Sequence, residues 1–334
     1  MVMTPLSLAV PRAGLLQHDA PGRLTLQRGS WVHLLSYVAK VQSLPADFDT
    51  GSAATLEALH RVRGAVQGIG APGQLRALMK QDPECLARRM APDGAYAGAA
   101  WLAHRLHAGA LAMASFMAGL ERQGARMPGQ AWTDSLLQLG AMAEDGRSGV
   151  AGLAYAVKST IPGILGCNQA LALAFKADAR ALQLANEAMG ALKAQHEAVG
   201  QEIGGLGWLA SKARKAELEQ QLRALEGRRV EQSERVRKLG LAVSQIGAIL
   251  DEGAWLASGL GDMVEFAEKV NKTWTQVGSG LAQLAADANK AQLEDPAWMK
   301  SALGLDAAIA AWQAIGAAAQ QFMTDLDRAS TAAE

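Results

Sequence analysis

The sequence predicts an all-α protein, an elongated bundle of long antiparallel helices arranged as a coiled-coil hairpin with a small apolar head. Three observations lead to this class. Alanine, leucine and glutamine are plentiful, while valine, isoleucine and threonine are sparse, which favours helix over sheet. No proline occurs between Pro162 and Pro296. Within that stretch, apolar residues recur alternately four and three positions apart, which is the spacing of a coiled-coil seam.

Residues 1–170 are expected to form the N-terminal part of a helical tail bundle. The first 28 residues contain three prolines and read as an extended or loosely docked arm. Several helices follow, separated by prolines. Ser52 and Asp93 stand where they would cap two of these helices, because a side-chain oxygen just before a helix accepts hydrogen bonds from its first free amides.

The segment 148–175 is nearly uncharged, with Lys158 as its single interruption. The sequence KSTIPG is expected to break it into two apolar halves. Two interpretations stay open: a pair of buried helices joined by a turn, or a concealed membrane hairpin. Burial is favoured because each half is too short to span a bilayer. The apolar side chains concerned are Val150, Leu153, Val157, Ile161, Ile164 and Leu165.

Two long helices are predicted on either side of a glycine-rich stretch, one over 171–199 and one over 212–290. The seam of the first is Leu171, Phe175, Leu182, Ala185, Met189, Leu192 and Val199, with Asp178 and His196 as polar intrusions. The seam of the second begins with Leu218, Leu222, Leu225, Val236, Leu239, Val243, Ile246 and Leu250, with Arg229 and Gln232 interrupting it. After a three-residue shift at Gly253 it resumes with Leu256, Leu260, Met263, Ala267, Val270, Trp274, Val277, Leu281 and Leu284. Seams of this length predict an antiparallel helical hairpin.

Residues 200–211 form the predicted tip of this hairpin, a short apolar head that is followed directly by cations. Cations next to a Trp-bearing apolar edge suit a phospholipid interface, and they suit a protein partner equally well. The residues expected to contact membrane or partner are Ile203, Gly204, Gly205, Leu206, Gly207, Trp208, Leu209, Lys212, Arg214 and Lys215. A short tail helix over 291–334 is expected to fold back at the opposite end.

Composition and motifs argue against several function classes. The formal net charge is zero, which gives no electrostatic basis for binding nucleic acid. The glycines of 68–73 match GxGxxG on paper, but a helical pattern precedes them and Pro72 interrupts them, so we expect a loop. His104 and His107 lack the further ligands of a metal site, so we expect a core or interface pair. We therefore expect no enzyme, no metal and no cofactor.

Two further features bear on the compartment. Cys85 and Cys167 lack the spacing of a redox or zinc site. Two isolated buried thiols are expected, with a single disulfide bridge between them as the alternative. The N-terminal residues lack the basic start and long apolar core of a secretory signal. We therefore expect a protein that is made soluble. If it is secreted, as the resemblance described below implies, it leaves without a classical signal peptide.

The order of these features resembles the haemolysin BL and non-haemolytic enterotoxin family of α-helical pore-forming toxins, which are related to cytolysin A. The resemblance lies in IGGLGWLASKARKAELEQQLRALEGRR, in VEFAEKVNKTWTQVGSGLAQLAADA and in the closing Trp312-Gln313-Ala314-Ile315. It covers residues 170–320 in order and spacing, and only the helical layout before them. One departure is the head, which here is about ten residues long, whereas the membrane-active members of the family carry a long apolar head.

This resemblance implies a soluble cytotoxin component that assembles into a membrane pore. Its expected partners are one or two homologous toxin components and the lipid bilayer of a target cell, in a homo- or hetero-oligomer. A membrane-spanning helix needs about 20 residues, so the short head implies docking by the tip, or spanning by 148–175. The alternative function is a non-toxic coiled-coil scaffold or adaptor that binds a partner protein through the same tip.

Overall fold

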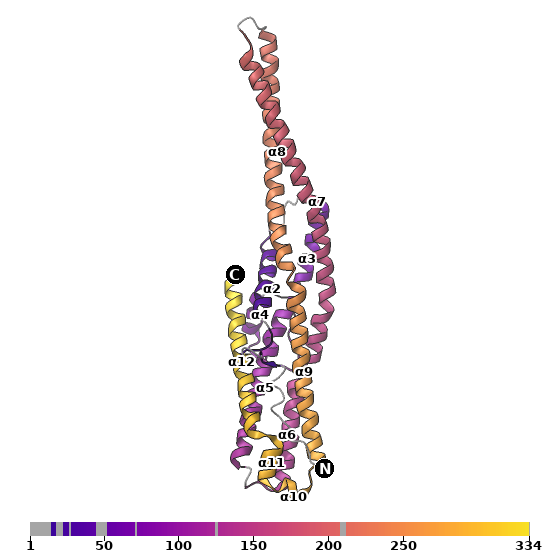
Figure 1. Ribbon diagram of the computed structural model, residues 1–334, viewed down its shortest axis with the longest axis vertical. Coiled ribbons are helices and arrows are strands. Elements are labelled where there is room, and N and C mark those ends of the chain that lie inside the picture. Colours follow the sequence, from indigo (N-terminus) through magenta and orange to yellow (C-terminus); the bar gives the residue numbers. More distant parts are fainter. Residues whose placement is uncertain are drawn as a thin grey trace. The chain divides into compact units, whose positions relative to one another are not determined.

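The computed structural model describes residues 15–17, 23–26, 28–44, 52–70, 72–123, 126–207 and 212–333. These residues are almost entirely helical, and they contain no strand apart from an isolated bridge between Leu16 and Leu24. The predicted all-α class is thereby confirmed (Figure 1). The helices are α2 (Arg28–Ser43), α3 (Ala53–Gln67), α4 (Pro72–Gln81), α5 (Ala95–Gln123), α6 (Gly129–Arg147), α7 (Val150–Gly205), α8 (Lys212–Gly253), α9 (Leu256–Asp287), α10 (Lys290–Leu293), α11 (Pro296–Leu303) and α12 (Leu305–Ala333).

The chain divides into two compact units. The first comprises residues 1–39, 65–163 and 253–334, and the second comprises residues 40–64 and 164–252. Several helices contribute to both units, because the division falls within α2, α3 and α7 and before the last residue of α8.

The first unit is a helical bundle in which α12 packs along α5, and α6 packs along α9. Trp274 of α9 and Trp312 of α12 stack with ring centroids 4.7 Å apart, and both are almost fully buried. Gly146 of α6 makes room for this pair, because a Cβ built on it would lie 2.5 Å from the Trp274 ring. The predicted seam residue Trp274 is thus a central core residue of this unit.

The start of α5 differs from the expectation that Asp93 caps it. The amides of Ala95 and Tyr96 donate to the carbonyls of Gly68 and Ile69, at distances of 3.3 and 2.9 Å. Because backbone carbonyls satisfy these first amides, the Asp93 carboxylate is not needed as a cap. The other predicted cap is present, since the Thr55 amide donates to the Ser52 hydroxyl at 3.3 Å. Residues 68–70 form the expected loop between α3 and α4, but the loop is shorter than the predicted 68–73, because Pro72 and Gly73 already belong to the first turn of α4.

The second unit contains the predicted hairpin, formed by the later part of α7 and by α8 (Figure 1). Three contacts fix its direction. A Cβ on Gly247 would lie 3.7 Å from the Phe175 ring, Gln232 Nε2 donates to the Ala185 carbonyl at 2.8 Å, and Arg214 pairs with Glu202 at 2.7 Å. As the residue numbers rise along α7, the numbers of the residues that they contact on α8 fall. The two helices are therefore antiparallel, as predicted.

The seam positions of the hairpin are confirmed by burial. Along α7, Leu171, Asp178 and Ala185 are buried, the seam positions between and after them are half-buried, and most of the intervening residues are exposed. Along α8, the same spacing holds from Leu218 to Leu239. Beyond this point the buried residues are Ala242, Ile246 and Ile249, so Val243 and Leu250 are only half-buried.

The structure corrects two predictions about where helices are interrupted. KSTIPG forms no turn, because α7 continues as one helix through Pro162. A proline removes one backbone donor and crowds the preceding turn, but the residues on both sides of Pro162 stay helical. The expected single helix over 291–334 is divided by Gly304, which has φ +57° and ends α11 as a left-handed cap.

Candidate interaction site at the hairpin end

The described part of the hairpin end consists of the last turn of α7, residues 206–207 and the first turns of α8. Ile203 and Leu206 are half-buried, whereas the three glycines Gly204, Gly205 and Gly207 are exposed. A Cβ built on any of these glycines would meet nothing within 4 Å. The seam thus continues to the end of α7 and is followed by small residues that leave the backbone open to an approaching surface.

Trp208 and Leu209, the largest side chains of the predicted tip, lie outside the described residues. Their place in the sequence is nevertheless bounded by the structure on both sides. The helices end at Gly205 and begin again at Lys212, so six residues join them. The connection is therefore short, and it carries two large apolar side chains between two long helices.

Arg214 is engaged within the hairpin. Its guanidinium pairs with Glu202 of α7 at 2.7 Å and with Glu217 of α8 at 3.0 Å. Hydrogen bonds to Glu202, and then to Glu217, raise the pKa of Arg214. The Glu202 contact joins the two helices beside the tip. This contact has a signal in the sequence, because oppositely charged residues flank the seam near both helix ends.

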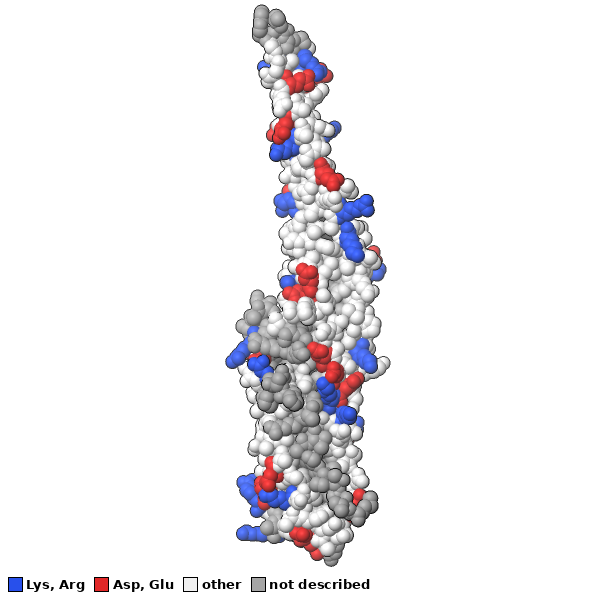
Figure 2. Space-filling model, in the orientation of Figure 1, with Lys and Arg blue, Asp and Glu red and all other residues white. Residues whose placement is uncertain are grey.

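Lys212 and Lys215 behave differently from Arg214. Both are exposed, and no acidic side chain in the described part of the chain pairs with either. Two cations are therefore available beside the tip. Figure 2 shows basic and acidic side chains interspersed over the visible face, without a large area of one sign. Attraction at the tip would be local and not a long-range effect of net charge.

The second predicted set of residues lies on α7 and not at the hairpin end. Val150, Leu153, Val157 and Ile164 are buried, whereas Ile161 and Leu165 are half-buried. Because α7 is one helix here, these residues form no hairpin. By length and composition alone, the helical stretches 129–205 and 296–328 are apolar enough to cross a membrane, with 28% and 50% of their most apolar windows buried.

The histidines and cysteines have structural surroundings. The Nδ1 atom of His107 lies 2.8 Å from the Gly316 carbonyl, which joins α5 to α12. Burial lowers the pKa of His104, and the neighbouring His107 and Arg105 charges act in the same direction. Cys85 is a buried free thiol as expected, whereas Cys167 is half-exposed because it lies at the edge of the buried face of α7. Among the described residues, no group of three or more potential metal ligands is present.

The fold is similar to that of solved structures. The soluble AhlC component of the tripartite alpha-pore forming toxin AHL, from Aeromonas hydrophila, is 13% identical to this chain, with a TM-score of 0.52. The likeness covers 86% of this chain and 94% of AhlC. A triple head mutant of AhlC gives a TM-score of 0.54 at 13% identity, covering 87% of this chain and 97% of the mutant chain.

A third structure is more distant. The SmhB pore of the tripartite toxin Smh, from Serratia marcescens, is 13% identical and covers 89% of this chain and 99% of its own, with a TM-score of 0.38. That score is too low to support an inference. No family model and no curated sequence matches the chain. The AhlC comparisons show that the chain has the fold of an α-helical toxin component, which confirms the fold expected from the resemblance.

Proposed function

We propose that this protein is a soluble component of a multi-subunit α-helical pore-forming cytotoxin. It docks on a membrane or on a partner subunit through the hairpin tip, and it oligomerises by helix packing. The expected partners are one or two homologous components and the bilayer of a target cell. The chain is secreted in a soluble form and acts at the membrane after assembly.

The single observation that carries this proposal is the hairpin itself. An antiparallel pair of helices with a shared apolar seam ends in a short, glycine-rich, apolar connection followed by two available lysines. The fold likeness to AhlC, a component of a tripartite pore-forming toxin, extends over 86% of the chain and supports the same role. Neither docking nor oligomerisation, as proposed, requires a catalytic site.

The length of the tip favours docking over spanning. Six residues between the two helix ends are far fewer than the roughly 20 needed to cross a bilayer as a helix. Each large apolar side chain that leaves water would contribute about 1.5–3 kcal/mol to docking. Ile203 and Leu206 are already half-buried, so Trp208 and Leu209 are the side chains we expect to supply most of the gain.

The direct test is release of dye from lipid vesicles, with the protein alone and with the products of neighbouring genes. We expect release only with the full set of components. Trp208→Ala together with Leu209→Ala should reduce vesicle binding or partner binding by at least about 100-fold, because two large apolar contacts are lost. Leu184→Ala is the matched control, since Leu184 is 57% exposed on α7 away from the tip.

A site-specific fluorophore distinguishes a toxin from an adaptor. Tryptophan replacement is unsuitable, because Trp31, Trp101, Trp132, Trp274 and Trp312 are buried core residues. An environment-sensitive label on Ser211→Cys, in a Cys167→Ser background, should shift to the blue on adding vesicles. A label at the exposed position Ser233 serves as the control. Unchanged emission with vesicles, together with a shift on adding a partner protein and no dye release with any component, would favour the adaptor.

A further inference from the structure

Among the described residues, Asp178 of α7 is the only charged residue that is buried, with 2% of its surface exposed. Its Oδ2 atom has no hydrogen-bond partner, and no described residue pairs with the carboxylate or donates to it. Ser135, another buried polar residue, by contrast donates to the Ala131 carbonyl at 2.7 Å. A carboxylate that leaves water without gaining a donor lowers the stability of the folded state. The place of Asp178 therefore calls for a physical reason.

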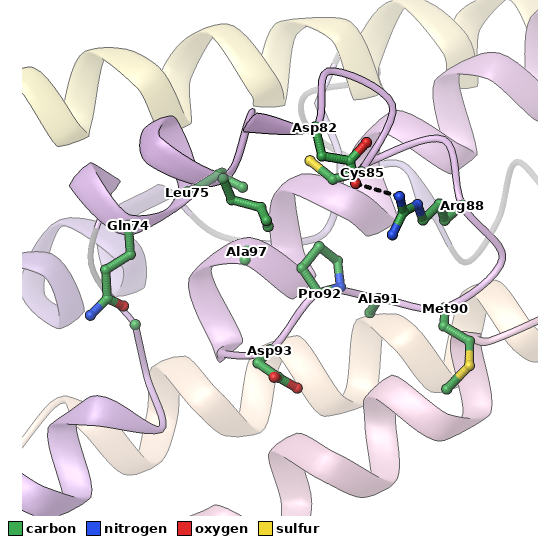
Figure 3. A pocket seen from close by; sticks show the side chains of 12 residues that line it. Gln74, Leu75, Asp82, Cys85, Arg88, Met90, Ala91, Pro92, Asp93 and Ala97 are labelled. Atoms are coloured by element: carbon green, nitrogen blue, oxygen red, sulfur yellow. Dashed lines mark ion pairs between the residues drawn. The ribbon is translucent and has the colours of Figure 1, made fainter. Parts of the chain in front are cut away.

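Acidic residues beside a hollow in the first unit show the usual arrangement. This hollow, of about 460 Å³, is lined by the turn after α4, by the loop before α5 and by α5 itself (Figure 3). Asp82 in its wall pairs with Arg88 at 2.7 Å, and Asp93 is exposed to water. Asp178 has neither a cation among the described residues nor access to water.

Asp178 lies in a deeply buried layer of the second unit. A Cβ on Gly247 of α8 would lie 3.7 Å from the Phe175 ring, and Asp178 follows Phe175 by less than one turn of α7. Toward the tip, the seam residues Leu182 and Leu192 are only half-buried. The apolar residues around Asp178, by contrast, are all 0% exposed: Leu171, Ala242, Ile246 and Ile249. A pair of helices buries only a narrow strip, so a further element covers α7 and α8 at this level.

The first turns of α3 supply this cover. Residues 40–64 form one compact unit with residues 164–252, so α7 and α8 are the long helices against which α3 can pack. One face of the segment 53–64 is at most 6% exposed, and it consists of Thr55, Ala58, Leu59 and Val62. The Thr55 hydroxyl oxygen is also buried without a hydrogen-bond partner among the described residues. The cover thus encloses two unsatisfied polar groups, one on α7 and one on α3.

Two polar contacts anchor the base of this segment. Lys40 of α2 pairs with Glu252 of α8 at 2.8 Å, and Arg63 donates to the Leu44 carbonyl at 2.8 Å. Both contacts lie near the places where the chain passes between the two units, at residues 39–40 and 64–65. Thr55 stands two turns before Arg63, toward the beginning of α3. The base of the segment is therefore held by polar contacts, whereas the beginning of α3 covers an unsatisfied carboxylate.

We propose that residues 53–64 of α3 are a releasable cover of the α7–α8 pair, and that Asp178 keeps their attachment weak. While the cover is closed, the carboxylate lacks both water and a donor. When α3 lifts, water reaches the carboxylate while α7 and α8 remain helical. Opening therefore recovers hydration free energy that an apolar side chain at this position would not provide. The inference does not depend on the proposed function, because opening is measured without lipid or partner.

Hydrogen–deuterium exchange of the full-length protein in lipid-free buffer tests this proposal. In the wild type, the amides of residues 53–64 should exchange at least about ten-fold faster than those of α9. Asp178→Leu should slow the exchange of residues 53–64 by at least about ten-fold, because an apolar side chain has no hydration to recover. Asp251→Leu is the matched control, since it makes the same change at an exposed position of α8 in the same unit. It should leave the exchange of residues 53–64 unchanged.

Two further variants separate the unsatisfied groups from the size of the side chain. Asp178→Asn keeps the shape and removes the charge, so it should slow the exchange of residues 53–64, but by less than leucine does. Thr55→Val removes the hydroxyl from α3 at nearly constant shape and should slow it as well. Circular dichroism confirms that each variant is folded, and Asp178→Asn decides the matter if the leucine variant is not.

Two results would overturn the proposal. Unchanged or faster exchange of residues 53–64 in the folded Asp178 variants would show that the carboxylate does not weaken the attachment of α3. Equal slowing in residues 53–64 and in α9 would show that α3 opens only when the whole protein unfolds, and that it is not a separate cover.

Discussion

The seams of α8 and α9 have the same spacing but very different burial. All the predicted seam residues of α9, from Leu256 to Leu284, are buried. In α8, by contrast, the seam between Leu218 and Leu239 has only these two end residues buried, and the positions between them are half-buried. Both helices follow a 4-3 pattern, so the difference does not come from the pattern.

The number of helices that surround each seam explains the difference. In the first unit, α9 packs against α6 and α5, and Trp274 also stacks on Trp312 of α12. In the second unit, Gln232 and Arg214 near the hairpin end both contact α7. A seam between two helices buries only a narrow strip, while a bundle closes over its apolar residues from several sides. The apolar pattern fixes which residues face inward, and the neighbours decide how far they are buried.

The largest effect is expected from removing the aromatic centre of the first unit. Trp274→Ala should lower the free energy of unfolding by about 3–5 kcal/mol, because a large buried side chain is replaced by a cavity. Thermal unfolding followed by circular dichroism measures the change. The matched control is Trp255→Ala, since Trp255 is 54% exposed and stacks only on the His33 ring. A loss of less than about 1 kcal/mol for Trp274→Ala would show that the bundle closes around the gap.

A smaller and more local effect is expected at the hairpin end. Leu218 is 1% exposed, but it lies in a two-helix seam that can collapse around a smaller side chain. Leu218→Ala should therefore cost about 2 kcal/mol, near the lower limit for such changes. The loss should appear as faster hydrogen exchange in the first turns of α8, with little change in α9. Val230→Ala, at a 66% exposed position of the same helix, should leave exchange unchanged.

Much of this architecture follows from the sequence because a helical seam is a local pattern. The antiparallel hairpin, its seam and the Ser52 cap were predictable from spacing and residue type. The cap at Asp93 was predicted wrongly, since the carbonyls of Gly68 and Ile69 lie far from it in the sequence and satisfy the same amides. Long-range backbone contacts of this kind leave no local signal.

The candidate site was predictable only in part for the same reason. An apolar, glycine-rich stretch between two seams marks a hairpin tip, and Lys212 and Lys215 stand beside it. The pairing of Arg214 with Glu202 depends on the exact register of two helices. The continuity of α7 through Pro162 depends on how its flanks pack, which no local rule for proline contains. The deep burial of Asp178 depends on α3, which lies far from it in the sequence.

A third prediction concerns the polar residue that interrupts the seam. Gln232 Nε2 donates to the Ala185 carbonyl across the hairpin at 2.8 Å, in a partly buried place. Gln232→Ala should cost about 1 kcal/mol, the usual net contribution of one such hydrogen bond. Gln232→Leu should be close to neutral in stability, because apolar contact replaces the bond. Hydrogen-exchange rates around Ala185 measure both variants, and equal losses of stability in the two would show that apolar contact does not compensate for the lost hydrogen bond.

The smallest effect is expected for the ion pair beside the tip. Arg214 and Glu202 are 45% and 49% exposed at their side chains, so solvent and salt screen their attraction. Arg214→Ala should cost less than about 1 kcal/mol, and a double-mutant cycle with Glu202→Ala should give a coupling that falls as salt rises. Glu217 complicates the single variants, because it also pairs with Arg214 at 3.0 Å. The cycle is therefore repeated in a Glu217→Gln background. A coupling energy well above 1 kcal/mol in the Glu217→Gln background would show that this ion pair stabilises the hairpin end, and that packing along the seam is not sufficient to do so.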